Sequence, residues 1–204
     1  MLQGMTAHYL AFTTFPLKQG DCCLVHAAGG GVGGLLVQIA KLRGARVIAT
    51  VGSEAKAAVA REAGADEVIL YRQQDVAAEV KRITGGELCQ VVYDGLGRDT
   101  IQGSIASVAP RGLLVSYGQA SGPVGLVDPL AVLKGSKFMT RPTLADYIAT
   151  REQLLLRGGE VLGWIRDGQL RLRVHREYPL ADVATAHRDL EGSGTAGKLI
   201  LLPD

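Results

Sequence analysis

The chain has 204 residues, 47% of them hydrophobic and 21% charged, and a formal net charge of +2. This composition predicts a globular protein with a sizeable core, and the small net charge from interspersed Lys, Arg, Asp and Glu excludes a strongly basic nucleic-acid face. No apolar run reaches the roughly 18 residues of a membrane span, and the start shows no basic-then-apolar signal, so we expect a soluble protein without a membrane partner.

In chain order, the first distinctive stretch is 22–34, CCLVHAAGGGVGG, where an apolar run breaks into glycines and a helical pattern follows. A strand, a tight turn and a helix N-terminus present backbone N–H groups to a ligand, and glycines let a phosphate approach. We therefore predict a pyrophosphate site here, with a plain strand-to-helix turn as the alternative. Two registers fit, Gly29-x-Gly31-x-x-Gly34 and Ala27-x-x-Gly30-x-x-Gly33.

Strand and helix patterns alternate around and after this turn. We predict a first strand from residue 22, a helix from the glycines through residue 43, further strands at 46–51, 67–70, 90–93, 113–116 and 137–141, and helices at 54–64, 76–83 and 98–108. This alternation predicts an α/β fold, a Rossmann-type doubly wound parallel sheet with helices on both faces and right-handed crossovers.

The pattern changes after the last of these strands, where Pro142 bars its continuation. We predict a long helix over 148–165, a strand over 170–174, a helix over 182–190 and a closing strand over 198–202. These last two strands have no obvious partners in the parallel sheet. We therefore divide the chain into a dinucleotide-binding domain, residues 1–145, and a C-terminal part, residues 146–204.

The end of the second predicted strand, residues 50–53 (TVGS), lacks the carboxylate with which NAD-binding units hold the ribose hydroxyls. Ser53 is expected to cap the next helix, Lys56 follows one turn later, and Tyr71 comes after the neighbouring strand. A hydroxyl, an ammonium and a phenol together suit the 2′-phosphate of NADPH. An ordinary solvated lysine is the alternative for Lys56, and we expect Glu54 to point to solvent.

No catalytic set is recognisable, and we assign no catalytic residue. The histidines share no metal-ligand spacing, so zinc is not predicted; they are His8, His26, His175 and His187. His26 is expected to touch the cofactor loop or to be packed in its strand, and Asp94 to act as an acid or to form a turn before glycine. Cys22 and Cys23 are expected to be core residues, and three cysteines without a disulfide or metal pattern favour a reducing, cytoplasmic setting.

Seven segments along the chain resemble, in the same order, the quinone oxidoreductase (ζ-crystallin-like) branch of the medium-chain dehydrogenase/reductase superfamily. They are 3–7 (QGMTA), 26–33 (HAAGGGVG), 50–56 (TVGSEAK), 91–97 (VVYDGLG), 111–118 (RGLLVSYG), 138–142 (FMTRP) and 197–201 (GKLIL). Because they run over essentially the whole chain, the resemblance is more specific than any one motif.

The resemblance implies a cofactor site with the register Ala27-x-x-Gly30-x-x-Gly33 and the pyrophosphate near Gly31 and Val32. At the adenosine end it implies Gly52, Ser53, Lys56 and Tyr71 at the phosphate and ribose, with Gly95 near the adenosine. Toward the nicotinamide it implies Thr6, Tyr117, Gly118, Gln119, Phe138, Met139, Thr140 and Lys198.

The resemblance also implies an activity, the zinc-independent reduction of quinones or related activated alkenes by NADPH, for which the protein orients the cofactor and excludes water. Members of the group carry an N-terminal GroES-like domain, and this chain begins about where that domain ends, so we expect a fragment whose residues 146–204 would rejoin it. The alternatives are an NADPH-binding module without turnover and an enoyl-thioester reductase on the same scaffold. A homodimer through the edge strand at 137–141 is also expected.

Overall fold

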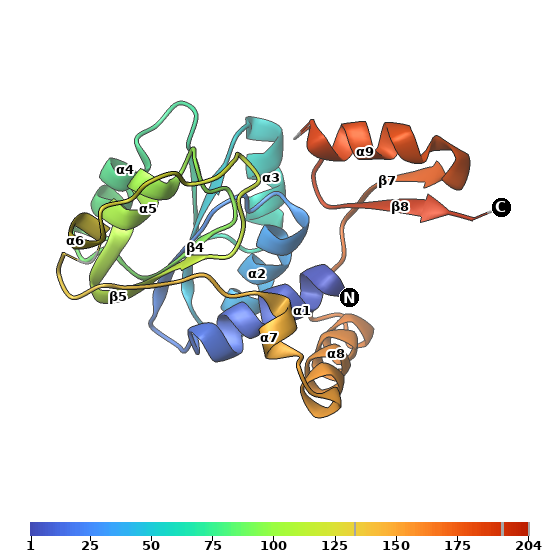
Figure 1. Cartoon of the computed structure of the whole chain (residues 1–204), viewed down its shortest axis with the longest axis horizontal. Helices are drawn as coiled ribbons and strands as arrows, with labels where there is room; N and C mark the ends of the chain where they lie inside the picture. The colour runs from blue at the N-terminus through green and yellow to red at the C-terminus, as the bar shows by residue number, and fades with distance from the viewer. Residues whose placement is uncertain (133, 193, 204) are drawn as a thin grey trace.

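The computed structural model describes residues 1–132, 134–192 and 194–203. Its centre is one parallel sheet of six strands, β1 (Cys22–Val25), β2 (Arg46–Val51), β3 (Glu67–Leu70), β4 (Cys89–Asp94), β5 (Val108–Ser116) and β6 (Phe138–Thr140). The strands follow the order β3-β2-β1-β4-β5-β6, all parallel. Figure 1 shows β4 and β5 with helices on either side of the sheet. This confirms the predicted Rossmann-type doubly wound sheet, in which the strand order reverses between β1 and β4.

Helices cover both faces of the sheet. They are α1 (Leu2–Tyr9), which runs into a π-helical turn η1 (Leu10–Thr14), α2 (Gly31–Leu42), α3 (Glu54–Glu62), α4 (Val76–Ile83), α5 (Ile101–Ser107), α6 (Pro129–Val132), α7 (Leu144–Tyr147) and α8 (Arg151–Arg166). One core layer joins the sheet to η1, α2, α3 and α8, and the second joins it to α4 and α5. Because both faces are covered, β2 is an almost continuous apolar run rather than an alternating one.

The N-terminal helix belongs to the first of these layers. Tyr9 and Leu10 are buried beside α2, and the Tyr93 hydroxyl donates a hydrogen bond to the Leu10 carbonyl (3.2 Å). A Cβ atom on Gly4 would lie 2.7 Å from Val161 Cγ1, so α1 and α8 are in close contact. Residues before β1 and after β6 thus meet on the same face of the sheet.

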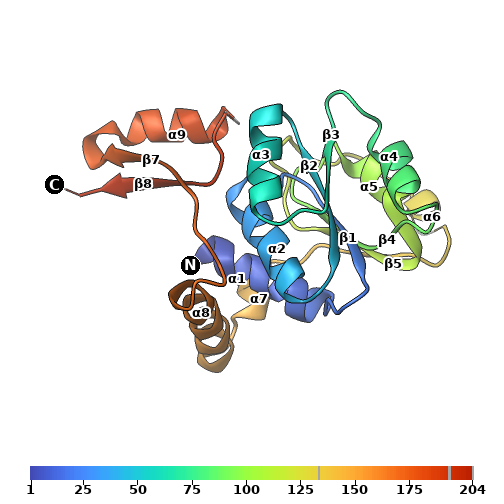
Figure 2. The same cartoon turned by 180° about the vertical axis from the view of Figure 1, so that it is seen from behind.

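A separate two-stranded parallel sheet follows α8. It consists of β7 (Val174–Pro179) and β8 (Lys198–Leu202), joined through the 3-10 turn η2 (Leu180–Asp182) and α9 (Val183–Glu191). Figure 2 shows this unit to one side of the main sheet, with the C-terminus at its outer end. The closing strand and the helix at 182–190 are confirmed within a residue. Within the described part of the chain, no helix is long and apolar enough to cross a bilayer.

The predicted strand at 170–174 is wrong, since β7 begins at Val174. Leu170 is buried in the core of the main sheet rather than exposed on a strand. The backbone N–H and carbonyl of Arg171 are both bonded to the side-chain amide of Gln38 in α2, at 2.8 and 3.1 Å. The side chain of Gln38 therefore satisfies the backbone hydrogen-bonding groups of Arg171, a residue that was expected to lie in a strand.

Two further boundaries differ from the predictions. The helix predicted at 98–108 is shorter in the structure and is only α5, because residues 95–100 form a turn and β5 already begins at Val108. The register of β5 shifts before Leu113, which accommodates Pro110. The long helix begins at Arg151 rather than at 148. Thr150 and Gln153 form a capping box that fixes its start.

Candidate functional site

The turn from β1 into α2 is very tight. Ala27 has a left-handed backbone (φ 52°), and its carbonyl oxygen accepts a hydrogen bond from the Gly30 N–H (2.8 Å). Gly33, in the first turn of α2, lies so close that a Cβ atom there would overlap the same carbonyl and stand 2.9 Å from Ala28 Cα. The helix can begin directly against the loop because residue 33 has no side chain.

The N-terminus of α2 is open to a ligand. Gly30 caps it in an extended conformation (φ −88°, ψ 177°), and no residue of the first turn is acidic. The first hydrogen bond within the helix runs from the Gly34 N–H to the Gly30 carbonyl (2.9 Å). The N–H groups of Gly31, Val32 and Gly33 therefore precede the hydrogen bonds of the helix. These three groups stand at the positive end of a 12-residue helix, a position that favours an anion.

Beside this loop, the end of β2 gathers polar groups. Ser53 caps α3 and accepts a hydrogen bond from the Lys56 N–H (3.4 Å). A Cβ atom on Gly29 would lie 3.0 Å from Lys56 Cβ, so the lysine stem packs against the glycine loop. A Cβ atom on Gly52 would lie 3.4 Å from the Tyr71 hydroxyl, which places the phenol over the end of β2. Three predicted positions, 53, 56 and 71, are thus neighbours of the loop or of Gly52.

Arg72 is a member of this group that was not included among the predicted site residues. Its Nε atom would lie 3.3 Å from a Cβ atom on Gly52, and its guanidinium carbon lies 6.0 Å from the centre of the Tyr71 ring. Burial, with a further contribution from the Arg72 charge, lowers the pKa of Lys56. In the sequence, the signal that could have identified Arg72 was its position directly after the predicted site residue Tyr71. Glu54 is exposed, as expected.

A buried hydrogen-bond network lies under the loops at the ends of β1, β2 and β4. The Asp94 carboxylate accepts hydrogen bonds from the Ser104 hydroxyl (2.6 Å) and the Thr100 hydroxyl (2.9 Å). Ser104 Oγ also lies 2.9 Å from His26 Nε2, and His26 Nδ1 lies 2.8 Å from Thr50 Oγ1. All five side chains are buried, and burial lowers the pKa of His26.

Asp94 also organises the turn after β4. Its carboxylate accepts hydrogen bonds from the N–H groups of Leu96 and Gly97, both at 2.9 Å. This confirms the turn-forming alternative for Asp94, and the packed-strand alternative for His26 agrees with its burial. From the sequence, Asp94 and His26 could be considered only as separate residues. Their membership of one hydrogen-bond network is visible only in the folded structure.

The loops after β4 and β5 are pressed together. A Cβ atom on Gly95 would lie 2.8 Å from the Tyr117 hydroxyl, and one on Gly118 would lie 2.6 Å from the Gly95 carbonyl oxygen. Burial, and then the charge of Asp94, raises the pKa of Tyr117. Gln119 is exposed beyond this contact. The predicted residues 95, 117, 118 and 119 therefore form one group at the same sheet edge as the glycine loop.

A groove of about 420 Å³ opens on the outer side of the glycine loop. Gly29, Gly30 and Gly31 line it together with Gln3 and Lys198. Gly30 also forms an isolated parallel bridge with residue 197, which brings the start of β8 to the loop. Lys198, which was predicted to lie toward the nicotinamide, is thus beside the glycine loop in the structure.

Of the predicted cofactor residues, Gly30, Gly31 and Lys198 line this groove in the described part of the chain, and the others lie outside its lining. Phe138 and Met139 are 62% and 40% exposed on the edge strand β6, with Thr140 next to them. The Thr6 hydroxyl donates a hydrogen bond to the Leu2 carbonyl within α1 (2.8 Å). Among the residues that the structure describes, no three His, Cys, Asp or Glu side chains gather as a metal site would require.

Comparison with known proteins adds a family to this geometry. The sequence profile described as zinc-binding dehydrogenase matches residues 31–152. A quinone oxidoreductase of Pseudomonas aeruginosa is 46% identical over 205 residues, which cover 100% of this chain and 63% of that protein. A 2-haloacrylate reductase of Burkholderia sp. is 42% identical over 206 residues, covering 100% of this chain and 62% of the reductase.

The fold has an equally similar counterpart among solved structures. The crystal structure of Escherichia coli quinone oxidoreductase complexed with NADPH matches with a TM-score of 0.95 and 43% identity, covering 100% of this chain and 63% of the other. The chain therefore spans less than two thirds of the length of these relatives.

Proposed function

Because the chain belongs to the zinc-binding dehydrogenase family, we propose that it forms the NADPH-binding part of an oxidoreductase that reduces quinones or related activated alkenes. The observation that carries this proposal is the end of β2, where Ser53, Lys56 and Arg72 lie together beside a helix N-terminus and residues 50–53 include no carboxylate. Two cations and a hydroxyl suit the 2′-phosphate that distinguishes NADPH from NADH.

The geometry of the loop supports the same cofactor. A pyrophosphate needs close backbone approach and N–H donors, and the N–H groups of Gly31, Val32 and Gly33 stand at the start of α2, with the Gln3 side chain packed beside Gly31. The overlap of a Cβ on Gly33 with the Ala27 carbonyl favours the register Ala27-x-x-Gly30-x-x-Gly33. We assign the pyrophosphate to the N–H groups of Gly31 and Val32.

NADPH, when bound, supplies a hydride, so this chain need not supply a nucleophile. We assign three tasks to its residues. Ser53, Lys56, Tyr71 and Arg72 hold the adenosine phosphate and ribose, and Gly52 and Gly95 leave room for the adenosine. Lys198 neutralises charge beside the pyrophosphate. Thr6, Tyr117, Gly118, Gln119, Phe138, Met139 and Thr140 are proposed toward the nicotinamide, where they orient the ring and exclude water.

We propose a substrate with an electron-poor double bond. Relatives named quinone oxidoreductase and 2-haloacrylate reductase both act, by their names, on electron-poor double bonds. An enoyl-thioester reductase belongs to the same class of chemistry. The absence of zinc from this reaction stays a prediction from the family resemblance.

Two properties of the whole protein are proposed with the activity. The exposed Phe138 and Met139 lie on an unpaired sheet edge, which supports a homodimer through β6. Size-exclusion profiles that stay monomeric over a wide concentration range would count against it. Three free cysteines agree with a reducing, cytoplasmic location.

The test is a titration of the chain with NADPH, followed by addition of a simple benzoquinone while the NADPH absorbance is recorded. Saturable binding with quinone-dependent oxidation supports an enzyme, and binding without oxidation supports the alternative of a binding module. Failure to bind NADPH overturns the proposal. Arg46→Gln, at the opposite edge of the sheet, is the control that should behave as the wild type.

A further inference from the structure

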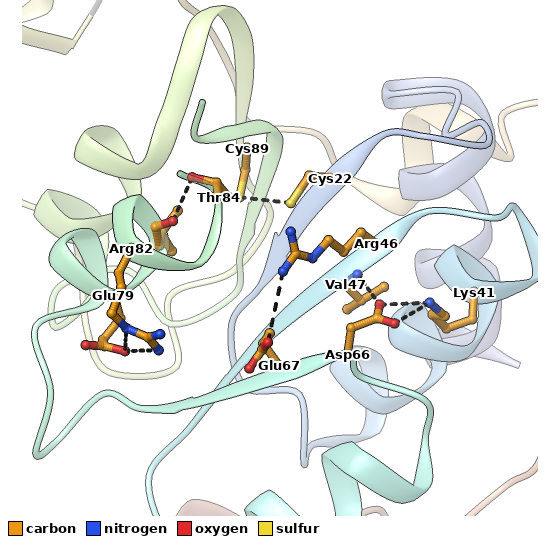
Figure 3. A network of polar contacts seen from close by, with 11 residues as sticks. Cys22, Lys41, Arg46, Val47, Asp66, Glu67, Glu79, Arg82, Thr84 and Cys89 are labelled. Carbon is orange, nitrogen blue, oxygen red and sulfur yellow. Dashed lines mark hydrogen bonds and ion pairs between the residues drawn. The ribbon is translucent and has the colours of Figure 1, made fainter. Parts of the chain in front are cut away.

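Two of the three cysteines meet at the amino edge of the sheet, away from the proposed cofactor site. Cys22 opens β1 and Cys89 opens β4, and their sulfur atoms lie 3.8 Å apart. Figure 3 shows the two side chains pointing toward one another from neighbouring segments. Such a contact is a hydrogen bond between thiols and, with a small rotation of either side chain, a position from which a disulfide can form.

The backbone geometry allows that bond. Cys23 is paired with Val91, so Cys22 lies opposite Gln90, one residue from Cys89. The Cys22 N–H donates a hydrogen bond to the Gln90 side-chain carbonyl (2.7 Å), which holds the two chain segments together at this point. Regular strand spacings would put two Cα atoms on neighbouring strands, one residue out of register, about 6 Å apart, inside the range of natural disulfides. The strand is irregular at Cys89, and the Cys89 side chain packs in the same core layer as Cys22.

The surroundings give the two thiols different roles. Cys22 is partly exposed, whereas Cys89 is fully buried. A hydrogen bond from Cys89, together with the positive charge of Arg46, lowers the pKa of Cys22 against the opposing effect of burial. The same hydrogen bond and burial raise the pKa of Cys89. Cys22 is therefore the thiol that ionises and meets an oxidant first, and Cys89 is the neighbour that can resolve it.

The third cysteine provides an internal control. Cys23 is next to Cys22 in the sequence, but successive side chains of a strand point to opposite faces. Cys23 is buried in the core layer with α2, whereas Cys89 is buried in the layer with α4 and α5, against which Cys22 also packs. Burial raises the pKa of Cys23. It can neither reach Cys89 on the same face nor react readily.

We propose that Cys22 and Cys89 form a reversible intramolecular disulfide when the protein meets a hydroperoxide. The Cys22 thiolate attacks one peroxide oxygen, which breaks the O–O bond, releases hydroxide and leaves a sulfenic acid. The Cys89 thiol then attacks the Cys22 sulfur, the S–S bond forms, and the sulfenic oxygen leaves as water with the Cys89 proton. The two sulfur atoms are oxidised and the peroxide is reduced. This site is independent of the proposed cofactor function.

The experiment treats the folded chain with hydrogen peroxide, blocks the remaining thiols, and measures the intact mass and the peptides released without reduction. We expect loss of two of the three thiols, a mass about 2 Da lower before blocking, and a peptide pair that links residues 22 and 89. Dithiothreitol should restore both thiols. Cys23→Ala should give the same cross-link, and Cys22→Ser should give none.

Peptide mapping of the wild-type chain decides the proposal even if a variant fails to fold. A link that fragment-ion sequencing assigns to Cys23 instead of Cys22, a cross-link between two chains, or a gain of oxygen without any link would overturn it. Persistence of the 2 Da loss in Cys22→Ser would do the same, because the remaining two cysteines lie on opposite faces of the sheet.

Discussion

The two edges of the six-stranded sheet are held in different ways. At the carboxyl edge, the loops are fixed by the buried Asp94 network and by backbone contacts that only glycine permits. At the amino edge, ion pairs between half-exposed side chains, such as Lys41–Asp66 and Arg46–Glu67, surround the cysteine pair (Figure 3). The shape of the candidate site therefore depends on a few positions that tolerate no side chain or no loss of a carboxylate, whereas the opposite edge should accept substitutions.

The largest effect is expected at Gly33. A side chain there overlaps the Ala27 carbonyl, so Gly33→Val should displace the start of α2, destroy the row of free N–H groups and abolish binding of NADPH and NADH alike. Isothermal titration of both nucleotides measures this. Gly159→Ala, in a helix position with open space around it, is the control and should bind as the wild type. Full binding by Gly33→Val would show that the loop tolerates displacement.

The next effect concerns the buried carboxylate. Asp94→Ala removes the acceptor for two hydroxyls and two backbone N–H groups, so it should lower the free energy of unfolding by about 3 kcal/mol. Urea denaturation measures the change. Asp99→Ala removes an exposed carboxylate that pairs with Arg98, and it should change stability by less than about 0.5 kcal/mol. Equal effects at the two positions would contradict the network.

A pH effect of intermediate size follows from the buried histidines. Burial lowers the pKa of His26, and also that of His8, below the ordinary value of 6.5. As the pH falls through 6.5, the unfolded chain binds protons that the folded chain does not, so stability should decline by up to about 1.4 kcal/mol per pH unit for each histidine.

The pH dependence is measured by urea denaturation between pH 7 and the pH at which the fold is lost. His26→Gln should give a shallower decline, because one of the two histidines no longer contributes. An unchanged slope in this variant would mean that His26 is protonated equally in both states.

The smallest effect is expected at the amino edge. The Arg46 and Glu67 side chains are about half exposed and 4.0 Å apart, so Arg46→Gln should change stability by less than about 1 kcal/mol. Nucleotide affinity should stay the same. A loss of stability as large as that of Asp94→Ala would remove the difference between the two edges.

Much of the fold could be predicted from local patterns. The apolar run at 46–51 and the Ser53 cap were both confirmed, because strand periodicity and capping depend on neighbouring residues. The strand predicted at 170–174 failed because Gln38, more than a hundred residues away, bonds the backbone of Arg171. Contacts between such distant residues leave no local signal.

The candidate site also has parts that local sequence patterns predict and parts that they do not. Its glycine loop, Ser53 and Lys56 follow from motif spacing and from the missing carboxylate after β2. The network of Asp94, His26 and Ser104 depends on three elements that only the folded sheet brings together, so the sequence could present its members only one by one. Arg72 joins the site through the position of β3 beside β2.

The central claim, that the end of β2 selects NADPH, is tested most directly by the ratio of the Kd values for NADH and NADPH. The wild-type chain should bind NADPH at least about tenfold more tightly, and Lys56→Gln and Arg72→Gln should each reduce that ratio by weakening NADPH while leaving NADH unchanged. Equal Kd values for the two nucleotides in the wild type, unaffected by either substitution, would contradict the account.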